Sequence, residues 1–167
     1  MKAFELKLLA PQGRGLEIGE IRGFLAQVLD ACGEGGDTLL LPPDMTRLHS
    51  GANVLAREMY ALVGERTPAA QVKVMPALGT HDPMSKEEKL AFFGDSIPDD
   101  ACLIHDWKNG VEKIGEVPAS FVKEVSEGLM DEDIFIEVNR ELLKPEYKAI
   151  FSLGQVVPHE VVGMGNY

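Results

Sequence analysis

Three signatures of common enzyme classes are missing from this 167-residue sequence. It has no Gly-x-Gly-x-x-Gly loop, no phosphate-binding loop of the NTPase type and no Gly-x-Ser-x-Gly turn. Classical dinucleotide binding, ATP hydrolysis and serine hydrolysis are therefore disfavoured.

Cysteine and long apolar runs are also scarce. Cys32 and Cys102 are the two cysteines, which gives neither a disulfide framework nor a zinc-ligand spacing, so we expect buried, inert thiols. No stretch is long enough to cross a membrane, and charges at Lys2, Glu5 and Lys7 interrupt the N-terminus, which is unlike a signal peptide. The expected location is the cytoplasm, with no membrane partner.

Positive charge is in short supply. The chain has 16 basic and 27 acidic side chains, a net charge of −11, which disfavours nucleic acid as a partner because phosphates require a basic face. The hydrophobic share of 45% is that of a globular protein. We therefore expect residues 1–167 to form a single α/β domain with a real core.

Apolar periodicity predicts alternating strands and helices. The expected strands are residues 4–9, 37–42, 72–78, 111–117, 134–138 and, as the final strand, 149–153. Helices are expected from residue 18 to the glycines at 33–36, around 54–63, and at 85–93, where Ser-Lys-Glu-Glu forms a capping box. Residues 120–125 fit either a helix or a strand, and residues 139–143 fit a short helix.

This order is typical of an α/β fold. We expect a three-layer architecture, in which a twisted and mainly parallel sheet has helices on both faces. The irregular region between residues 111 and 138 could add an antiparallel hairpin.

Polar clusters follow three of the apolar runs. Residues 43–47 (Pro-Asp-Met-Thr-Arg) and 79–82 (Gly-Thr-His-Asp) each begin where an expected strand ends, and residues 158–160 (Pro-His-Glu) end the polar segment that follows the strand expected at 149–153. Ligands of open α/β sheets bind at the carboxyl ends of the strands. We therefore expect one arginine and two histidines, distant in sequence, to share one crevice.

Each cluster has a plain structural interpretation as well. Asp44 and Thr46 could cap a helix that carries an exposed Arg47, or could contact a cofactor, while the guanidinium matches a carboxylate or a phosphate. His81 and His159 could exchange protons near neutral pH, or could simply be satisfied turn residues. Gly79 would let a ligand approach the backbone.

Two further histidines are weaker candidates. His49 could be a solvated loop residue, and His105, followed by Asp106, is more often engaged in a structural hydrogen bond. Direct metal binding ranks low, because the sequence has no His-Glu-x-x-His spacing.

Taken in order and spacing, residues 43–47, 79–88 and 158–160 resemble the N-terminal domain of lactate racemase-type nickel-pincer enzymes. The resemblance spans nearly the whole chain and is clearest from about residue 37 onward. It implies the N-terminal half of a larger two-domain enzyme, with the active site between this domain and a C-terminal partner domain.

The resemblance also implies a chemistry. Enzymes of this family use a nickel pincer nucleotide, a lysine-tethered pyridinium that accepts hydride, to racemise or epimerise a small-molecule 2-hydroxy acid. The family's carboxylate-binding arginine matches Arg47, and its two acid/base histidines match His81 and His159. Asp44, Thr46 and Gly79 become candidate contacts of the cofactor.

The chain departs from the family pattern at three places. Leu48 stands where the family usually has proline, and Asp82 stands where an arginine is common. Because an anion replaces a cation there, we expect a hydroxy acid other than lactate. The tethering lysine and the nickel-ligating histidine are absent from these 167 residues, so this fragment alone is expected to be inactive.

Two alternatives stay open at this point. The chain could be a stand-alone α/β domain that binds a small anion without converting it. It could also be a hydrolase with a metal held directly by His81, His105 and His159. The sequence does not indicate an oligomeric state.

Overall fold

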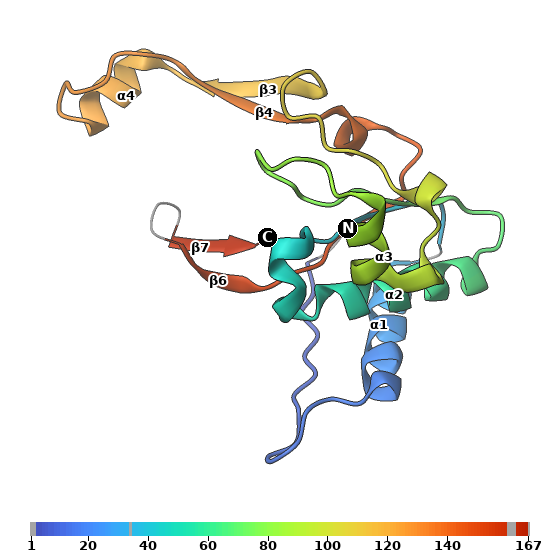
Figure 1. Cartoon of the computed structure of the whole chain (residues 1–167). Helices are drawn as coiled ribbons and strands as arrows, with labels where there is room; N and C mark the ends of the chain where they lie inside the picture. Colours follow the sequence, from blue (N-terminus) through green and yellow to red (C-terminus); the bar gives the residue numbers. More distant parts are fainter. Residues whose placement is uncertain (1–2, 34, 160–162, 167) are drawn as a thin grey trace. The chain divides into compact units, whose positions relative to one another are not determined.

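The computed structural model describes residues 3–33, 35–159 and 163–166 (Figure 1). The chain folds into two compact units. The first consists of Met1–Ile104 with Glu146–Tyr167, and the second of His105–Pro145. That the chain forms a single domain within a larger enzyme stays a prediction.

A three-stranded parallel sheet forms the centre of the first unit. Its strands are β1 (Thr38–Leu41), β2 (Val72–Val74) and β5 (Ala149–Ser152), in the order β2-β1-β5. The central strand is a run of leucines because buried parallel strands are covered on both faces, and Leu39 and Leu40 are both fully buried. The predicted α/β class with a mainly parallel sheet is thus confirmed.

Three helices pack with this sheet around one core. They are α1 (Ile18–Cys32), α2 (Ala52–Arg66) and α3 (Lys86–Phe93). In the register of the sheet Leu40 lies opposite Val74 and Phe151, and these side chains belong to the same apolar cluster as residues from all three helices. The helical members buried in this cluster are Leu25, Ala56, Met59, Leu62, Val63, Phe92 and Phe93.

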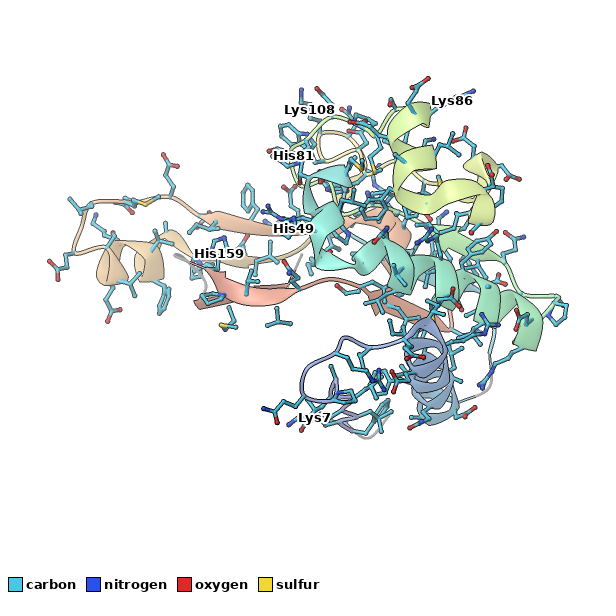
Figure 2. All side chains as sticks on the ribbon, turned by 60° about the horizontal axis from the view of Figure 1, so that its bottom comes forward. Lys7, His49, His81, Lys86, Lys108 and His159 are labelled. Carbon is cyan, nitrogen blue, oxygen red and sulfur yellow. The ribbon has the colours of Figure 1, made fainter. Side chains whose placement is uncertain are left out.

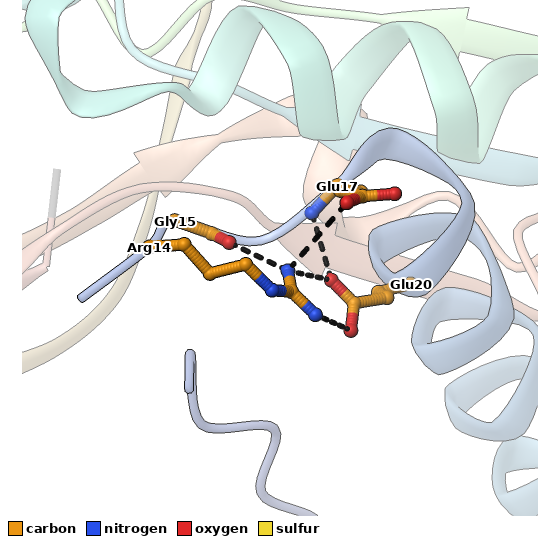
Figure 3. Close-up of polar contacts among 4 residues, drawn as sticks. All are labelled: Arg14, Gly15, Glu17 and Glu20. Atoms are coloured by element: carbon orange, nitrogen blue, oxygen red, sulfur yellow. Dashed lines mark hydrogen bonds and ion pairs between the residues drawn. The ribbon is translucent and has the colours of Figure 1, made fainter. Parts of the chain in front are cut away.

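A bidentate ion pair stabilises the start of α1 (Figure 3). Both terminal nitrogens of Arg14 donate to the Glu20 carboxylate at 2.8 Å, and the same carboxylate accepts the backbone N–H of Glu17 at 2.9 Å. The Arg14 hydrogen bond, helped by the Glu17 amide, lowers the pKa of Glu20 to about 2. The carboxylate also favours the helix because it lies near the positive end of the helix dipole.

Local signals at two other helix ends are confirmed. Ser85 and Glu88 exchange side-chain-to-backbone hydrogen bonds at the start of α3, which is the expected capping box. Helix α1 ends at Gly33, whose φ of 96° favours glycine.

The second unit is built on an antiparallel hairpin of β3 (Val111–Val117) and β4 (Ile134–Asn139), as the sequence suggested. The segment between the strands contains α4 (Ala119–Val125), and the short 3-10 helix η4 (Arg140–Leu143) follows β4. The pairing shifts register between Lys113 and Gly115, so β3 carries a bulge.

Three expectations about strands are wrong. Residues 3–11 form neither helix nor strand, and with Phe4 and Leu9 exposed, the apolar alternation has no partner strand among the described residues. The strand expected at 72–78 stops at Val74, since Pro76 cannot donate to a ladder. Nor is β5 the final strand, because the hairpin of β6 (Val156–His159) and β7 (Gly163–Asn166) follows it.

The remaining short elements are 3-10 helices. They are η1 (Met45–Ser50), η2 (Gly94–Ser96) and η3 (Asp99–Ala101). None of the helices in the described part of the chain combines the length and the apolar character needed to span a membrane.

Candidate functional site

The loops after β1, β2 and β5 leave the sheet at one edge. Since all three strands are parallel, their carboxyl ends lie together. Beyond the strands, Pro43 forms a parallel bridge with Ala77, whose N–H donates to the carbonyl oxygen of Pro42 at 2.7 Å. On the other side the N–H of Leu153 donates to the carbonyl oxygen of Leu41 at 3.0 Å. The segments that lead to the three polar clusters therefore leave the sheet at neighbouring points.

Asp44 joins two of these clusters. It caps η1, where its Oδ1 accepts the N–H of Thr46 at 2.9 Å and the hydroxyl of Thr46 at 2.5 Å. Its Oδ2 lies 2.6 Å from Nδ1 of His81. The Asp44 side chain is 8% exposed, whereas that of His81 is 58% exposed. A buried carboxylate thus holds one side of an imidazole whose ring reaches the surface.

The charge state of Asp44 determines what this hydrogen bond does. Burial by itself raises the pKa of the carboxyl group, but the hydrogen bonds from Thr46 and His81 outweigh that effect and keep the pKa below its ordinary value of 3.8. An ionised carboxylate can only accept, so Nδ1 of His81 must carry the proton. The Nε2 of a neutral His81 is then left with a lone pair, as a general base requires.

Gly79 shapes the loop beside this histidine. Its φ is 58°, a left-handed conformation that glycine adopts without strain. The position that a Cβ would occupy has no heavy atom within 4 Å, and the N–H of His81 closes the turn on the carbonyl oxygen of Leu78 at 3.0 Å. The loop therefore leaves open space at Gly79, which precedes His81 by two residues.

Arg47 belongs to the same turn as Asp44. Its N–H donates to the carbonyl oxygen of Asp44 at 3.1 Å, and it is half-buried. Its φ of −106° and ψ of 22° interrupt the regular helical geometry of η1. Asp44, Thr46 and Arg47 are therefore positioned by a single short segment, and the Asp44 hydrogen bond connects that segment to His81.

His159 comes from a different kind of element, the β6–β7 hairpin (Figure 2). It is half-buried and pairs in register with Gly163. A Cβ built on Gly165 would lie 3.5 Å from Cδ2 of His159, so the imidazole packs over the glycine backbone. Glu160, the last residue of the expected cluster, lies outside the described residues.

His105 is engaged structurally, as expected. Its Nδ1 lies 2.9 Å from Nδ2 of the buried Asn139, whose Oδ1 accepts the N–H of Glu141. Within the described ranges, no three His, Cys, Asp or Glu side chains are arranged to hold a metal ion.

A comparison of the sequence with known protein families finds one that matches most of the chain. The family described as the lactate racemase N-terminal domain matches residues 27–166. This chain belongs to that family. The family region includes the three clusters at 43–47, 79–82 and 158–160. No curated protein matches the chain.

Two solved structures share the family fold. A protein from Thermotoga maritima is 30% identical, with a TM-score of 0.75 over 93% of this chain and 37% of its own. The lactate racemase apoprotein from Thermoanaerobacterium thermosaccharolyticum is 18% identical, with a TM-score of 0.52 over 72% of this chain and 28% of its own. The 167-residue chain thus spans about a third of the length of each of these two proteins.

The link between Asp44 and His81 was not evident from the sequence. The local pattern indicated a cap or a cofactor contact for Asp44, and the cap is present. The hydrogen bond joins Asp44 to His81, 37 positions away, and it forms because β1 is aligned with β2 in the sheet. Nor did any pattern indicate a cavity of about 650 Å³ at the opposite, amino edge of the sheet, where Thr38 and Ala149 line it.

Proposed function

We propose that this chain is the N-terminal part of a nickel-pincer-dependent racemase or epimerase that acts on a 2-hydroxy acid by hydride transfer. The observation that carries the proposal is the hydrogen bond of 2.6 Å between Asp44 and His81 at the carboxyl edge of the sheet. It prepares a histidine as a proton acceptor beside the turn that carries Arg47, whose guanidinium we expect to bind a carboxylate. Racemisation of a 2-hydroxy acid requires both a proton acceptor and a group that binds the carboxylate.

His81 accepts the proton of the substrate hydroxyl at Nε2. The Asp44 carboxylate fixes the orientation of the ring and stabilises the imidazolium that forms, which is a positioning role. Arg47 binds the substrate carboxylate through two parallel hydrogen bonds and keeps the molecule aligned while the α-carbon becomes planar. His159 performs the same acid/base role for the opposite enantiomer.

The residues at this edge fit the organic part of the pincer nucleotide. The space beside Gly79 admits a ligand, and Thr46 is an exposed hydroxyl residue in the same loop pair. Among the described residues, no three His, Cys, Asp or Glu side chains could hold a metal ion together. This chain would therefore contact the nucleotide, while other parts of the enzyme bind the nickel. When bound, the cofactor supplies the hydride acceptor.

Asp82 favours a substrate other than lactate. It is exposed next to His81 and has no hydrogen-bond or ion-pair partner among the described residues. An uncompensated carboxylate at the rim repels a second negative charge on the substrate and favours a neutral or cationic substituent. We therefore propose a 2-hydroxy acid whose side chain extends toward Asp82.

The test is expression of the full-length gene product together with cofactor biosynthesis. We expect lysine-linked nucleotide and nickel by mass spectrometry, and interconversion of the enantiomers of at least one 2-hydroxy acid. The 167-residue chain alone should show no turnover. Absence of both cofactor and turnover in the full-length protein, together with binding of a small carboxylate by the chain alone, would replace the enzymatic proposal with anion binding.

A sharper probe is Arg47→Lys in the active protein, with His49→Asn as the matched control. Lysine keeps the charge but loses the two-pronged geometry, so kcat/KM should fall by roughly 10- to 100-fold. His49 lies exposed on the same 3-10 helix and its replacement should leave kcat/KM unchanged. Equal activity of Arg47→Lys and wild type would remove Arg47 from the site.

A further inference from the structure

The second unit, His105–Pro145, exposes an unusual amount of apolar surface for its size. Ten of the twenty large hydrophobic residues that are exposed in the described chain belong to these 41 positions. The buried side chains of the unit, within the described residues, are Val122 and Asn139. A two-stranded hairpin with so little core gains stability by covering its apolar face.

One face of the hairpin is aliphatic. Because side chains alternate along a strand, Ile134, Ile136 and Val138 of β4 point to the same side, and the register places Val117 opposite Ile134. Ile134 and Ile136 are 47% and 46% exposed. The opposite face carries Phe135 and Glu137.

The free edge of β4 is suited to pair with another strand. The sheet contains only β3 and β4 within the described residues, so each has one open edge. The bulge near Gly115 distorts β3, and bulges disfavour further pairing. Strand β4 is paired without interruption over its six residues and presents a regular row of backbone donors and acceptors.

Charge narrows the choice of partner. The unit has ten acidic and five basic side chains, a net charge of −5. All five cations are already engaged inside the unit, four in ion pairs with acidic side chains and Lys108 over the Trp107 ring. Four carboxylates have no partner among the described residues, namely those of Glu124, Glu127, Glu132 and Glu137. A second copy would bring the same uncompensated negative charge, whereas a basic partner would neutralise it.

We propose that the free edge of β4 binds an extended polypeptide segment in which aliphatic and basic residues alternate. Its backbone would extend the hairpin to three strands. Its aliphatic side chains would lie beside Ile134 and Ile136, and its basic side chains would lie beside Phe135 and Glu137. The contact of Lys113 with the Phe135 ring, 4.0 Å from the centroid, shows that this face accommodates a cation.

The experiment uses the 167-residue chain and a synthetic peptide, acetyl-Lys-Ile-Lys-Val-Lys-Ile-Lys-amide. Amide chemical shifts report where it binds, and a titration gives the Kd at low and at high salt. We expect shifts centred on β4 and a Kd that rises with salt. A peptide of the same composition with its lysines grouped at one end, and a peptide with glutamate in place of lysine, should bind at least tenfold more weakly.

Three variants localise the contact. Ile136→Ser should weaken binding about tenfold because it removes the aliphatic contact, and Glu137→Lys should weaken it about fivefold because attraction becomes repulsion. Ile150→Ser, at an exposed isoleucine on β5 of the other unit, should not change the Kd.

Four results would overturn the proposal. They are equal binding of the grouped peptide, binding without shifts in β4, no binding at all, and a dimer of the chain in sedimentation that Ile136→Ser dissociates. The last result would assign the edge to a second copy.

Discussion

The two candidate acid/base histidines are held in different ways. His81 follows a strand of the central sheet and donates to a buried carboxylate, which is itself fixed by Thr46 and by its role as a helix cap. His159 lies on a two-stranded hairpin, where its ring packs over the backbone of Gly165. The two imidazoles thus have different surroundings, which are a buried carboxylate beside the central sheet for His81 and the backbone of a glycine-containing hairpin for His159.

Replacing either histidine should have the largest effect. His81→Asn and His159→Asn in the full-length enzyme should each lower kcat by about 10²- to 10⁴-fold, because each removes an acid/base group. Since the equilibrium between enantiomers is fixed, kcat/KM must fall by the same factor in both directions. Polarimetric or chiral chromatographic assays measure this. Full activity of either variant would show that the two histidines do not have equivalent roles.

Asp44→Asn should affect the catalytic role of His81 and leave that of His159 unchanged. The asparagine can still accept from Thr46 and cap η1, but it would present an amide N–H to His81 if Oδ1 keeps that cap. Nδ1 would then have to accept, Nε2 would carry the proton, and the base would be lost. We expect kcat to fall at least tenfold, with the thermal midpoint nearly unchanged. Asp44→Ala should in addition destabilise the protein by about 1 kcal/mol, because the cap is lost.

A pair of glycine substitutions compares the loop beside His81 with the β6–β7 hairpin through their effects on protein stability. Gly79→Ala forces alanine into a φ of 58°, which should destabilise the protein by about 1–2 kcal/mol even though the space is open. Gly165→Ala has no such conformational strain, and its Cβ would only touch the His159 ring at 3.5 Å. Its free energy of unfolding should stay within about 0.5 kcal/mol of wild type. Urea denaturation measures both values.

The smallest expected effect concerns acid pH. The pKa of Asp44 is lowered in the folded protein, so its contribution to stability is complete above the ordinary carboxyl value of 3.8 and disappears as pH falls through the lowered pKa. Between pH 5 and about 3 wild type should therefore lose slightly more unfolding free energy than Asp44→Asn. An identical pH dependence of the two proteins would show that Asp44 is not held in its ionised form by Thr46 and His81.

Local sequence signals predicted most of the first unit. The leucine run of β1, the helical periodicity of α1 and α2 and the Ser85 capping box each depend on neighbouring residues, and all are present. The convergence of three strand ends at one edge followed from parallel pairing alone. The meeting of the clusters at 43–47 and 79–82 could therefore be predicted from local patterns and one rule of sheet topology. That His159 shares their crevice stays a prediction.

The failures share a physical cause. The alternation at residues 4–9 satisfies a strand pattern, but a strand exists only when a partner edge is available. Strand β6 was missed because it contains Pro158 and its partner β7 contains Gly163 and Gly165, residues that ordinarily weaken a strand. The hydrogen bond from His81 to Asp44 spans 37 positions and depends on the alignment of two loops. Long-range pairing is what local patterns do not encode.

The tautomer of His81 decides whether Asp44 prepares this histidine for catalysis, and long-range ¹H–¹⁵N correlation spectra measure it directly. In the 167-residue chain, at a pH where the imidazole is neutral, we predict that His81 carries its proton on Nδ1 and that Asp44→Asn moves it to Nε2. A wild-type His81 that is protonated on Nε2, or that exchanges between tautomers like a free histidine, would contradict that role of Asp44.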